Sequence, residues 1–93
     1  DIAYFYSLEK VTFAVTKDGK AHVVELPLSK LEEQLDGRVF FRVNRQFILS
    51  ADSIRNIQHY FNGKAVVSVW PAYEGTIQIS RERMILLKMW LNS

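Results

Sequence analysis

The sequence predicts a mostly β fold with two helices, and three observations carry that prediction. Asp18-Gly19 and Asn62-Gly63 each separate two apolar runs, and such dipeptides are strong signals of an antiparallel hairpin. Apolar residues alternate with small or polar ones over residues 11–16, as they do in a half-buried strand. Ser29 and Ser80 each precede a segment with apolar residues at helical spacing, so a helix is expected after each serine.

The first hairpin is expected to join strands over residues 11–16 and 21–26. A two-residue turn at Asp18-Gly19 would fix the register of this hairpin. It pairs Phe13 with Val24, Val11 with Leu26 and Val15 with His22, and it gives one core face to Val11, Phe13, Val15, Val24 and Leu26. Residues 1–4 read as the start of an earlier strand, so the chain is expected to be excised from a longer protein.

The first helix is expected between Pro27, which ends the strand, and Gly37. Ser29 and Glu32 have the spacing of a capping box, with Ser29 as the N-cap. Leu31 and Leu35 share one helical face, while Glu32 and Glu33 lie outside. This acidic outer face would be repelled by DNA. It therefore indicates a helix that covers a sheet and not one that reads DNA.

The second half of the sequence predicts strands over residues 54–60, 64–70 and 76–79. Both faces of the middle strand carry apolar residues, so a sheet covered on both sides is expected. Ile57 of the preceding strand and Val66 of the middle strand are assigned to the same face. The closing helix, Arg81–Leu91, is broadly apolar, and Trp90 near its end is a candidate for contact with a partner.

Composition excludes several classes of function. The chain has 93 residues, enough for one domain, and a net charge of +2 with no cysteine. No apolar run approaches the roughly 20 residues that span a bilayer, so no membrane partner is expected. Neither His22 nor His59 has an acid at the spacing of a triad or a metal site. We therefore expect no enzyme, no cofactor and no metal.

The segment from Phe40 to Ser50 carries the candidate binding residues. Arg42, Asn44, Arg45 and Gln46 interrupt an otherwise apolar run. Arg45 lies where the apolar pattern breaks and restarts, so a loop is expected to present it. One reading is that these are solvated positions on a half-exposed strand. The other is that the guanidinium binds a phosphate or forks onto a guanine edge.

In its motifs the chain resembles a LytTR domain, the DNA-binding output domain of bacterial two-component response regulators. Leu31-Glu32-Glu33-Gln34-Leu35 follows the first hairpin, Ile54-x-x-Ile57 lies further on, and Ile79-Ser80-Arg81 precedes the last helix. Most specific is the stretch from Phe40 to Leu49, which is similar to the family's Phe-x-Arg-x-His-Arg-Ser-Tyr-x-Val. Asn44 and Gln46 depart from the family's His and Ser.

This resemblance implies an elongated stack of small antiparallel sheets whose loops enter successive major grooves of DNA. Arg45 matches the base-reading position, Arg81 and nearby Arg83 match a second contact loop, and Lys10 and Lys64 lie in further contact regions. The full set of expected DNA-binding residues is Lys10, Arg42, Asn44, Arg45, Gln46, Lys64, Gln78, Arg81 and Arg83.

The expected function is sequence-specific binding of double-stranded DNA in transcription regulation, within a cytoplasmic phosphorelay. The expected partners are DNA, a second copy on adjacent repeats, because one small domain reads few base pairs, and an upstream receiver domain in the full-length protein. The alternative is a protein–protein interaction module of a signalling protein that uses the closing helix. Salt dependence separates the two, because only DNA binding should weaken steeply with salt.

Overall fold

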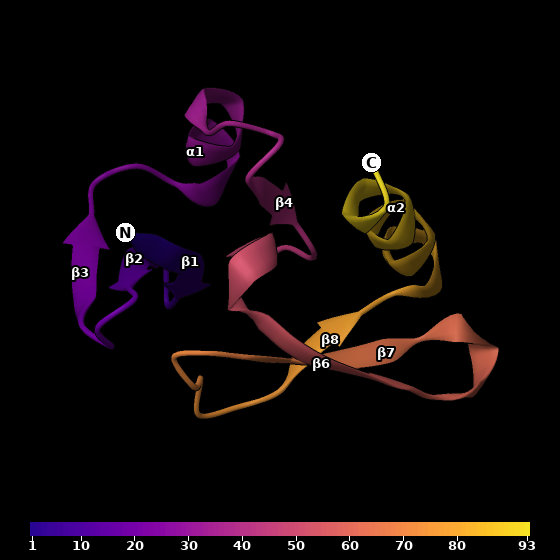
Figure 1. Ribbon diagram of the computed structural model, residues 1–93. Coiled ribbons are helices and arrows are strands. Elements are labelled where there is room, and N and C mark those ends of the chain that lie inside the picture. Colours follow the sequence, from indigo (N-terminus) through magenta and orange to yellow (C-terminus); the bar gives the residue numbers. More distant parts are fainter.

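The computed structural model describes all residues, 1–93, as two antiparallel sheets with two α-helices (Figure 1). A five-stranded sheet has the order β3-β2-β1-β5-β4, and a three-stranded sheet has the order β6-β7-β8. The molecule measures 35 × 26 × 23 Å along its principal axes. The elements are β1 (Ile2–Leu8), β2 (Val11–Thr16), β3 (Ala21–Val24), α1 (Leu28–Gln34), β4 (Phe40–Arg42), β5 (Phe47–Ser50), η1 (Ala51–Ser53), β6 (Ile54–His59), η2 (Phe61–Gly63), β7 (Ala65–Val69), β8 (Ile77–Ile79) and α2 (Arg81–Leu91). The predicted fold class is confirmed.

The β2–β3 hairpin has a different register from the predicted one. Thr16 N donates to Lys20 O at 2.9 Å, so the turn holds three residues, with Gly19 at φ +90°. Phe13 therefore pairs with Val23, and Val24 pairs with Thr12. The extra turn residue puts Phe13 and Val24 on opposite faces, so the predicted pairs and the single core face are wrong. His22, expected on the core side, is exposed on the edge strand β3.

The five-stranded sheet is covered on both faces. A small cluster on one face joins Phe5, Ala14 and Ile48 to Leu28 and Leu31 of α1. A cluster of 13 buried residues lies on the other face and spans both sheets. In this larger cluster, residues such as Tyr4, Val43 and Phe47 pack with Val67, Ile77, Ile79, Met84 and Leu87. The shared core fixes the loops of one sheet relative to those of the other.

Helix α1 begins two residues earlier than a cap at Ser29 predicts, at Leu28. Pro27 is its N-cap, and the Pro27 carbonyl oxygen accepts hydrogen bonds from Lys30 N at 3.0 Å and from Leu31 N at 3.1 Å. Ser29 is therefore inside the helix and cannot act as the N-cap, so the predicted capping box is wrong. The earlier start buries both Leu28 and Leu31 against the sheet.

The three-stranded sheet buries one face only, so the predicted cover on both sides is wrong. Ile57 pairs with Val67 across β6 and β7, and Val67 is buried while Ser68 is exposed. Antiparallel partners share a face, so Ile57 shares its face with Val67 and not with Val66. The Asn62-Gly63 hairpin itself is confirmed, with both residues at positive φ.

Helix α2 begins after Ser80, as predicted. The Ser80 hydroxyl oxygen accepts a hydrogen bond from Arg83 N at 3.2 Å. Met84 and Leu87 are buried, and Trp90 is half-buried, with its indole N–H donating to Gly37 O at 2.7 Å. Neither helix has the length and apolar character needed to cross a membrane.

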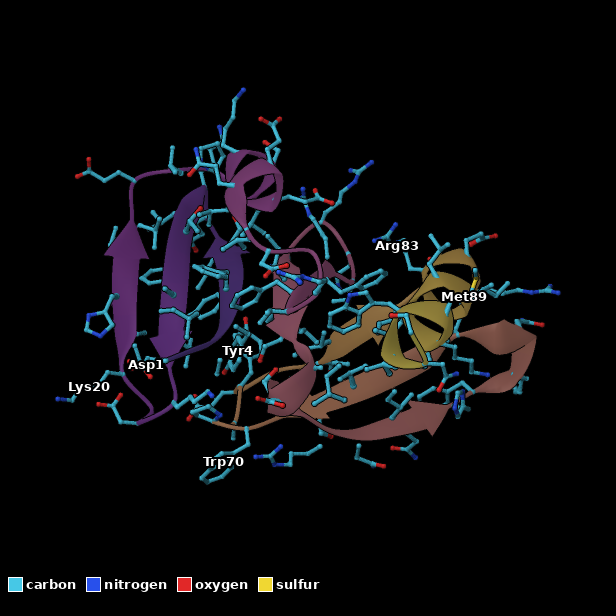
Figure 2. The ribbon with its side chains drawn as sticks, turned by 45° about the horizontal axis from the view of Figure 1, so that its top comes forward. Asp1, Tyr4, Lys20, Trp70, Arg83 and Met89 are labelled. Atoms are coloured by element: carbon cyan, nitrogen blue, oxygen red, sulfur yellow. The ribbon has the colours of Figure 1, made fainter.

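Tyr4 joins the two halves of the molecule. Its hydroxyl group donates to Pro71 O at 2.8 Å, in the loop between β7 and β8. Burial raises the pKa of Tyr4 to about 12, with smaller contributions from Tyr6 and Tyr73. Trp70, the residue before Pro71, projects into solvent and is 59% exposed (Figure 2).

Candidate nucleic-acid interface

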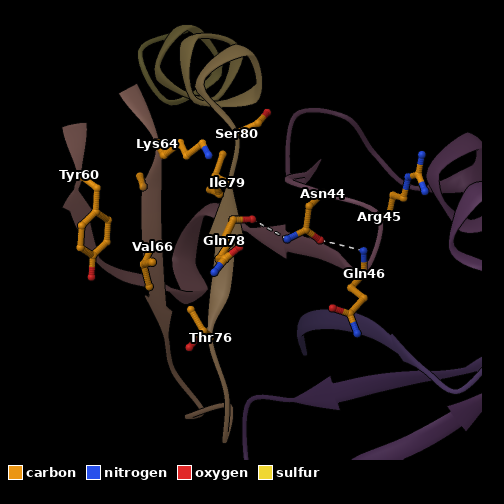
Figure 3. A pocket seen from close by; sticks show the side chains of 11 residues that line it. Asn44, Arg45, Gln46, Tyr60, Lys64, Val66, Thr76, Gln78, Ile79 and Ser80 are labelled. Carbon is orange, nitrogen blue, oxygen red and sulfur yellow. Dashed lines mark hydrogen bonds between the residues drawn. The ribbon is translucent and has the colours of Figure 1, made fainter. Parts of the chain in front are cut away.

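Five of the predicted DNA-binding residues line one open groove between the two sheets (Figure 3). The groove has a volume of about 840 Å³. One wall comes from the loop between β4 and β5, and the other comes from β7, β8 and the residues that flank them. The lining residues are Asn44, Arg45, Gln46, Tyr60, Lys64, Ala65, Val66, Thr76, Gln78, Ile79 and Ser80.

Asn44 holds the β4–β5 loop in shape and ties it to the other sheet. Its side-chain oxygen accepts hydrogen bonds from Gln46 N at 2.8 Å and from Phe47 N at 2.9 Å. Its side-chain nitrogen donates to Gln78 O at 2.7 Å, across the groove wall (Figure 3). All three bonds have good geometry, so the Asn44 amide is engaged within the protein.

Arg45 stands at the tip of this loop, as the broken apolar pattern predicts. Its side chain is exposed and takes part in no hydrogen bond or ion pair within the molecule. The neighbouring Gln46 lies beside β1, where its side-chain nitrogen donates to Ser7 O at 3.2 Å. The loop therefore presents the free guanidinium of Arg45 from a backbone that is held by hydrogen bonds.

Arg42 uses its guanidinium inside the protein. Its Nε donates to Asn44 O at 3.0 Å, and one Nη donates to Arg45 O at 2.9 Å. The other Nη contacts Glu32 of α1 at 3.3 Å. Arg42 thus supports the backbone on both sides of the loop tip.

Arg83 is also engaged within the protein. It donates from a terminal nitrogen to Arg42 O and places its guanidinium 4.7 Å from the centre of the Phe41 ring. This side chain is half-buried between α2 and β4 (Figure 2). Arg42 and Arg83 stay predictions as DNA contacts, and their internal bonds give both a supporting role.

The second wall of the groove carries Lys64 and ends at Arg81. The two lie close because Ala65, after Lys64, pairs with Ile79, two residues before Arg81. Both cations are exposed, and neither forms an ion pair within the molecule. Arg81 also packs its aliphatic stem over the β6–β7 turn, where a Cβ on Gly63 would lie 2.7 Å from Arg81 Cγ.

Lys10 lies outside the groove but at the same end of the five-stranded sheet as Arg45. It occupies the β1–β2 turn with Glu9, and both residues have positive φ, at 69° and 49° respectively. Near this turn, Ser7 N donates to Gln46 O at 2.9 Å. The β1–β2 turn and the β4–β5 loop are therefore neighbours.

The groove is lined by cations and neutral groups, with no acidic side chain among its residues. Such a surface attracts an anion, and the side-chain amide of Gln78 adds donors and an acceptor suited to base edges, whereas the Gln46 amide nitrogen donates to Ser7 O. The lining residues that were not predicted as DNA contacts are Tyr60, Ala65, Val66, Thr76, Ile79 and Ser80. The Asn62-Gly63 hairpin signal was enough to place Tyr60 near Lys64, but no local signal places Thr76.

Comparisons with known proteins agree on one family. Residues 1–92 match the family model described as LytTr DNA-binding domain. The sensory transduction protein LytT of Oceanobacillus iheyensis is 35% identical over 57 residues, which make up 61% of this chain and 23% of the relative. The chain thus spans about a quarter of that relative's length.

A solved structure has the same fold. It is the LytTr DNA-binding domain of a Bacillus cereus protein described as a methyl-accepting/DNA response regulator. The match has a TM-score of 0.81 at 17% identity and covers 99% of this chain and 82% of the other.

Proposed function

This chain belongs to the LytTR DNA-binding domain family, and from that membership we propose that it binds specific double-stranded DNA sequences. It would act as the output domain of a bacterial two-component transcriptional regulator, in the cytoplasm where bacterial DNA lies. The observation that carries the proposal is the groove between the sheets, which is free of acidic side chains and bordered by unpaired Arg45, Lys64 and Arg81.

Different residues take different parts in this proposal. Arg45 and Arg81 enter major grooves, where a guanidinium forks onto the O6 and N7 of guanine. Lys10 and Lys64 lie beside turns and contact phosphates, which carry no sequence information but fix the position of the protein. Gln46 and Gln78 face the same surface.

Three of the predicted contacts act mainly through their neighbours in this proposal. Asn44, Arg42 and Arg83 each form hydrogen bonds with the backbone of β4, of the β4–β5 loop or of β8. A side chain committed in this way cannot also form a bidentate contact with a base. These three residues therefore position Arg45.

In the full-length protein we propose an upstream receiver domain and a second copy of the domain on an adjacent repeat. A domain with a longest dimension of 35 Å covers about one turn of DNA. One turn offers few base contacts, so two copies are needed for specificity within a genome.

The test uses the duplex recovered by selection from a pool of randomised oligonucleotides. Arg45→Ala should weaken binding to this duplex by about 1–3 kcal/mol and relax the preference at one base position. Lys64→Ala should weaken binding to all duplexes alike and flatten the salt slope by roughly one unit. Fluorescence anisotropy over a salt series measures both.

A wild-type affinity that does not change with salt would contradict the proposal, since phosphate contacts release counterions. It would favour the alternative, a protein-interaction module that uses α2. That alternative has one supporting observation, since Ile85 and Met89 are 54% and 65% exposed on one side of the helix. Trp90, its predicted anchor, is instead half-buried and bonded to Gly37 O.

A further inference from the structure

Phe61 is the most exposed large apolar side chain of the molecule, at 88%. It lies at the tip of the β6–β7 hairpin, in the short turn η2. A phenyl ring in this position contributes nothing to either core cluster. The adjacent Tyr60, which is 52% exposed, lines the groove beside it (Figure 3).

The tip is held in a defined position. Tyr60 N donates to Lys64 O at 2.8 Å and closes the turn. Asn62 and Gly63 adopt φ values of 69° and 75°, which an Asn-Gly pair takes readily. Gly63 lies under the stem of Arg81, so the hairpin tip and the start of α2 form one unit. Phe61 is thus presented from the unit that holds Arg81.

The surroundings of Phe61 indicate what it contacts. The flanking cations, Lys64 and Arg81, are exposed and unpaired, and the adjoining groove has no acidic side chain. The complementary partner is an anion with an apolar group within reach of its charges. The DNA major groove combines phosphates on its rim with the C5 methyl group of thymine on its floor.

We propose that Phe61 contacts the methyl group of a thymine in the major groove that Arg81 enters. Phe61 would then be a specificity-determining residue beside the arginines. This inference rests on the DNA binding proposed above. Insertion of apolar side chains between base steps is typical of proteins that bind the minor groove. Because Arg81 is proposed to enter the major groove, we infer a methyl contact for the neighbouring Phe61.

The experiment replaces each thymine of the selected duplex, one at a time, with deoxyuridine, which lacks only the methyl group. At one position, deoxyuridine should weaken wild-type binding about fourfold, the effect of exposing one buried methyl group. Phe61→Ala should bind the thymine duplex correspondingly less well. It should show no further loss with deoxyuridine at that position.

Met89→Ala is the matched control, because Met89 is a 65% exposed apolar side chain on the outside of α2 (Figure 2). It should leave both the affinity and the deoxyuridine effect unchanged. The inference is overturned if Phe61→Ala binds like the wild type, or if deoxyuridine weakens both proteins equally at every position. If the wild type binds no duplex from the selection, the proposed DNA binding is overturned as well. The failure of the Phe61 inference alone can therefore be distinguished from the failure of the proposed function.

Discussion

At the level of single residues, the candidate interface contains side chains that are free and others that support the loop backbone. Arg45 and Arg81 are exposed without a partner in the molecule. Asn44 is the opposite case, with three hydrogen bonds of 2.7–2.9 Å that reach its own loop and β8. A change at Asn44 should therefore affect the fold, and a change at Arg45 should affect only binding.

Asn44→Ala should lower the free energy of unfolding by about 1–3 kcal/mol, because Gln46 N and Phe47 N lose their acceptor. Asn44→Asp keeps an acceptor oxygen for these two groups but sets its second carboxylate oxygen against Gln78 O, so it should lose stability through the contact with β8 alone. Arg45→Ala should stay within about 0.5 kcal/mol of the wild type. Urea denaturation of the three variants measures these differences. Equal stability of Asn44→Ala and the wild type would contradict the supporting role.

At the level of elements, the turn and cap residues explain how much of the fold was predictable. Asn62-Gly63 forms a hairpin and Ser80 caps a helix, as their local chemistry predicts, although the Asn62-Gly63 turn also holds three residues and is closed by Tyr60 N donating to Lys64 O. Asp18-Gly19 also forms a hairpin, but Asp-Gly suits both two- and three-residue turns, and the Asp18 carboxylate accepts a hydrogen bond from the Thr16 hydroxyl. The sequence alone could not choose between the two registers.

The candidate site was predictable to the same extent. The break in the apolar pattern located Arg45 in a loop, because exposure of a charge is a local property. Arg83 could not be told apart from a free arginine, because its acceptor, Arg42 O, is 41 residues away and only the tertiary fold brings it near. Arg42 donates to the carbonyls of Asn44 and Arg45, two and three residues further on, but only the conformation of the β4–β5 loop turns these carbonyls toward it. The partner of Asn44 is 34 residues away, which no local pattern reveals.

Substitutions at different positions of helix α2 should affect either the stability of the domain or its affinity for DNA. Leu87 is fully buried in the larger core cluster, so Leu87→Ala should cost about 2–5 kcal/mol of stability. Arg81→Ala should lose DNA affinity with the fold intact, and Ile85→Ala, on the exposed side, should change neither. Chemical denaturation and an electrophoretic mobility shift, expressed per folded molecule, measure the two effects. If Arg81→Ala unfolds the domain at constant affinity per folded molecule, Arg81 is structural.

At the level of the whole molecule, the shared core makes the two sheets one rigid support for the loops that are proposed to contact DNA. Thirteen buried residues from both sheets and α2 form that core. Tyr4 and Asn44 add hydrogen bonds between the two halves, to Pro71 O and Gln78 O. The turns that carry Lys10, Arg45 and Lys64 are therefore held at fixed separations, which the proposed reading of DNA grooves requires.

The edge formed by these loops is the surface proposed to meet DNA. A two-dimensional ¹H–¹⁵N NMR titration of the labelled domain with the selected duplex tests this directly. The largest amide shifts should occur at Lys10, Arg45, Lys64 and Arg81 and their neighbours, with α1 and β3 unchanged. Shifts concentrated on the exposed side of α2, around Ile85 and Met89, with the groove residues unchanged would contradict it.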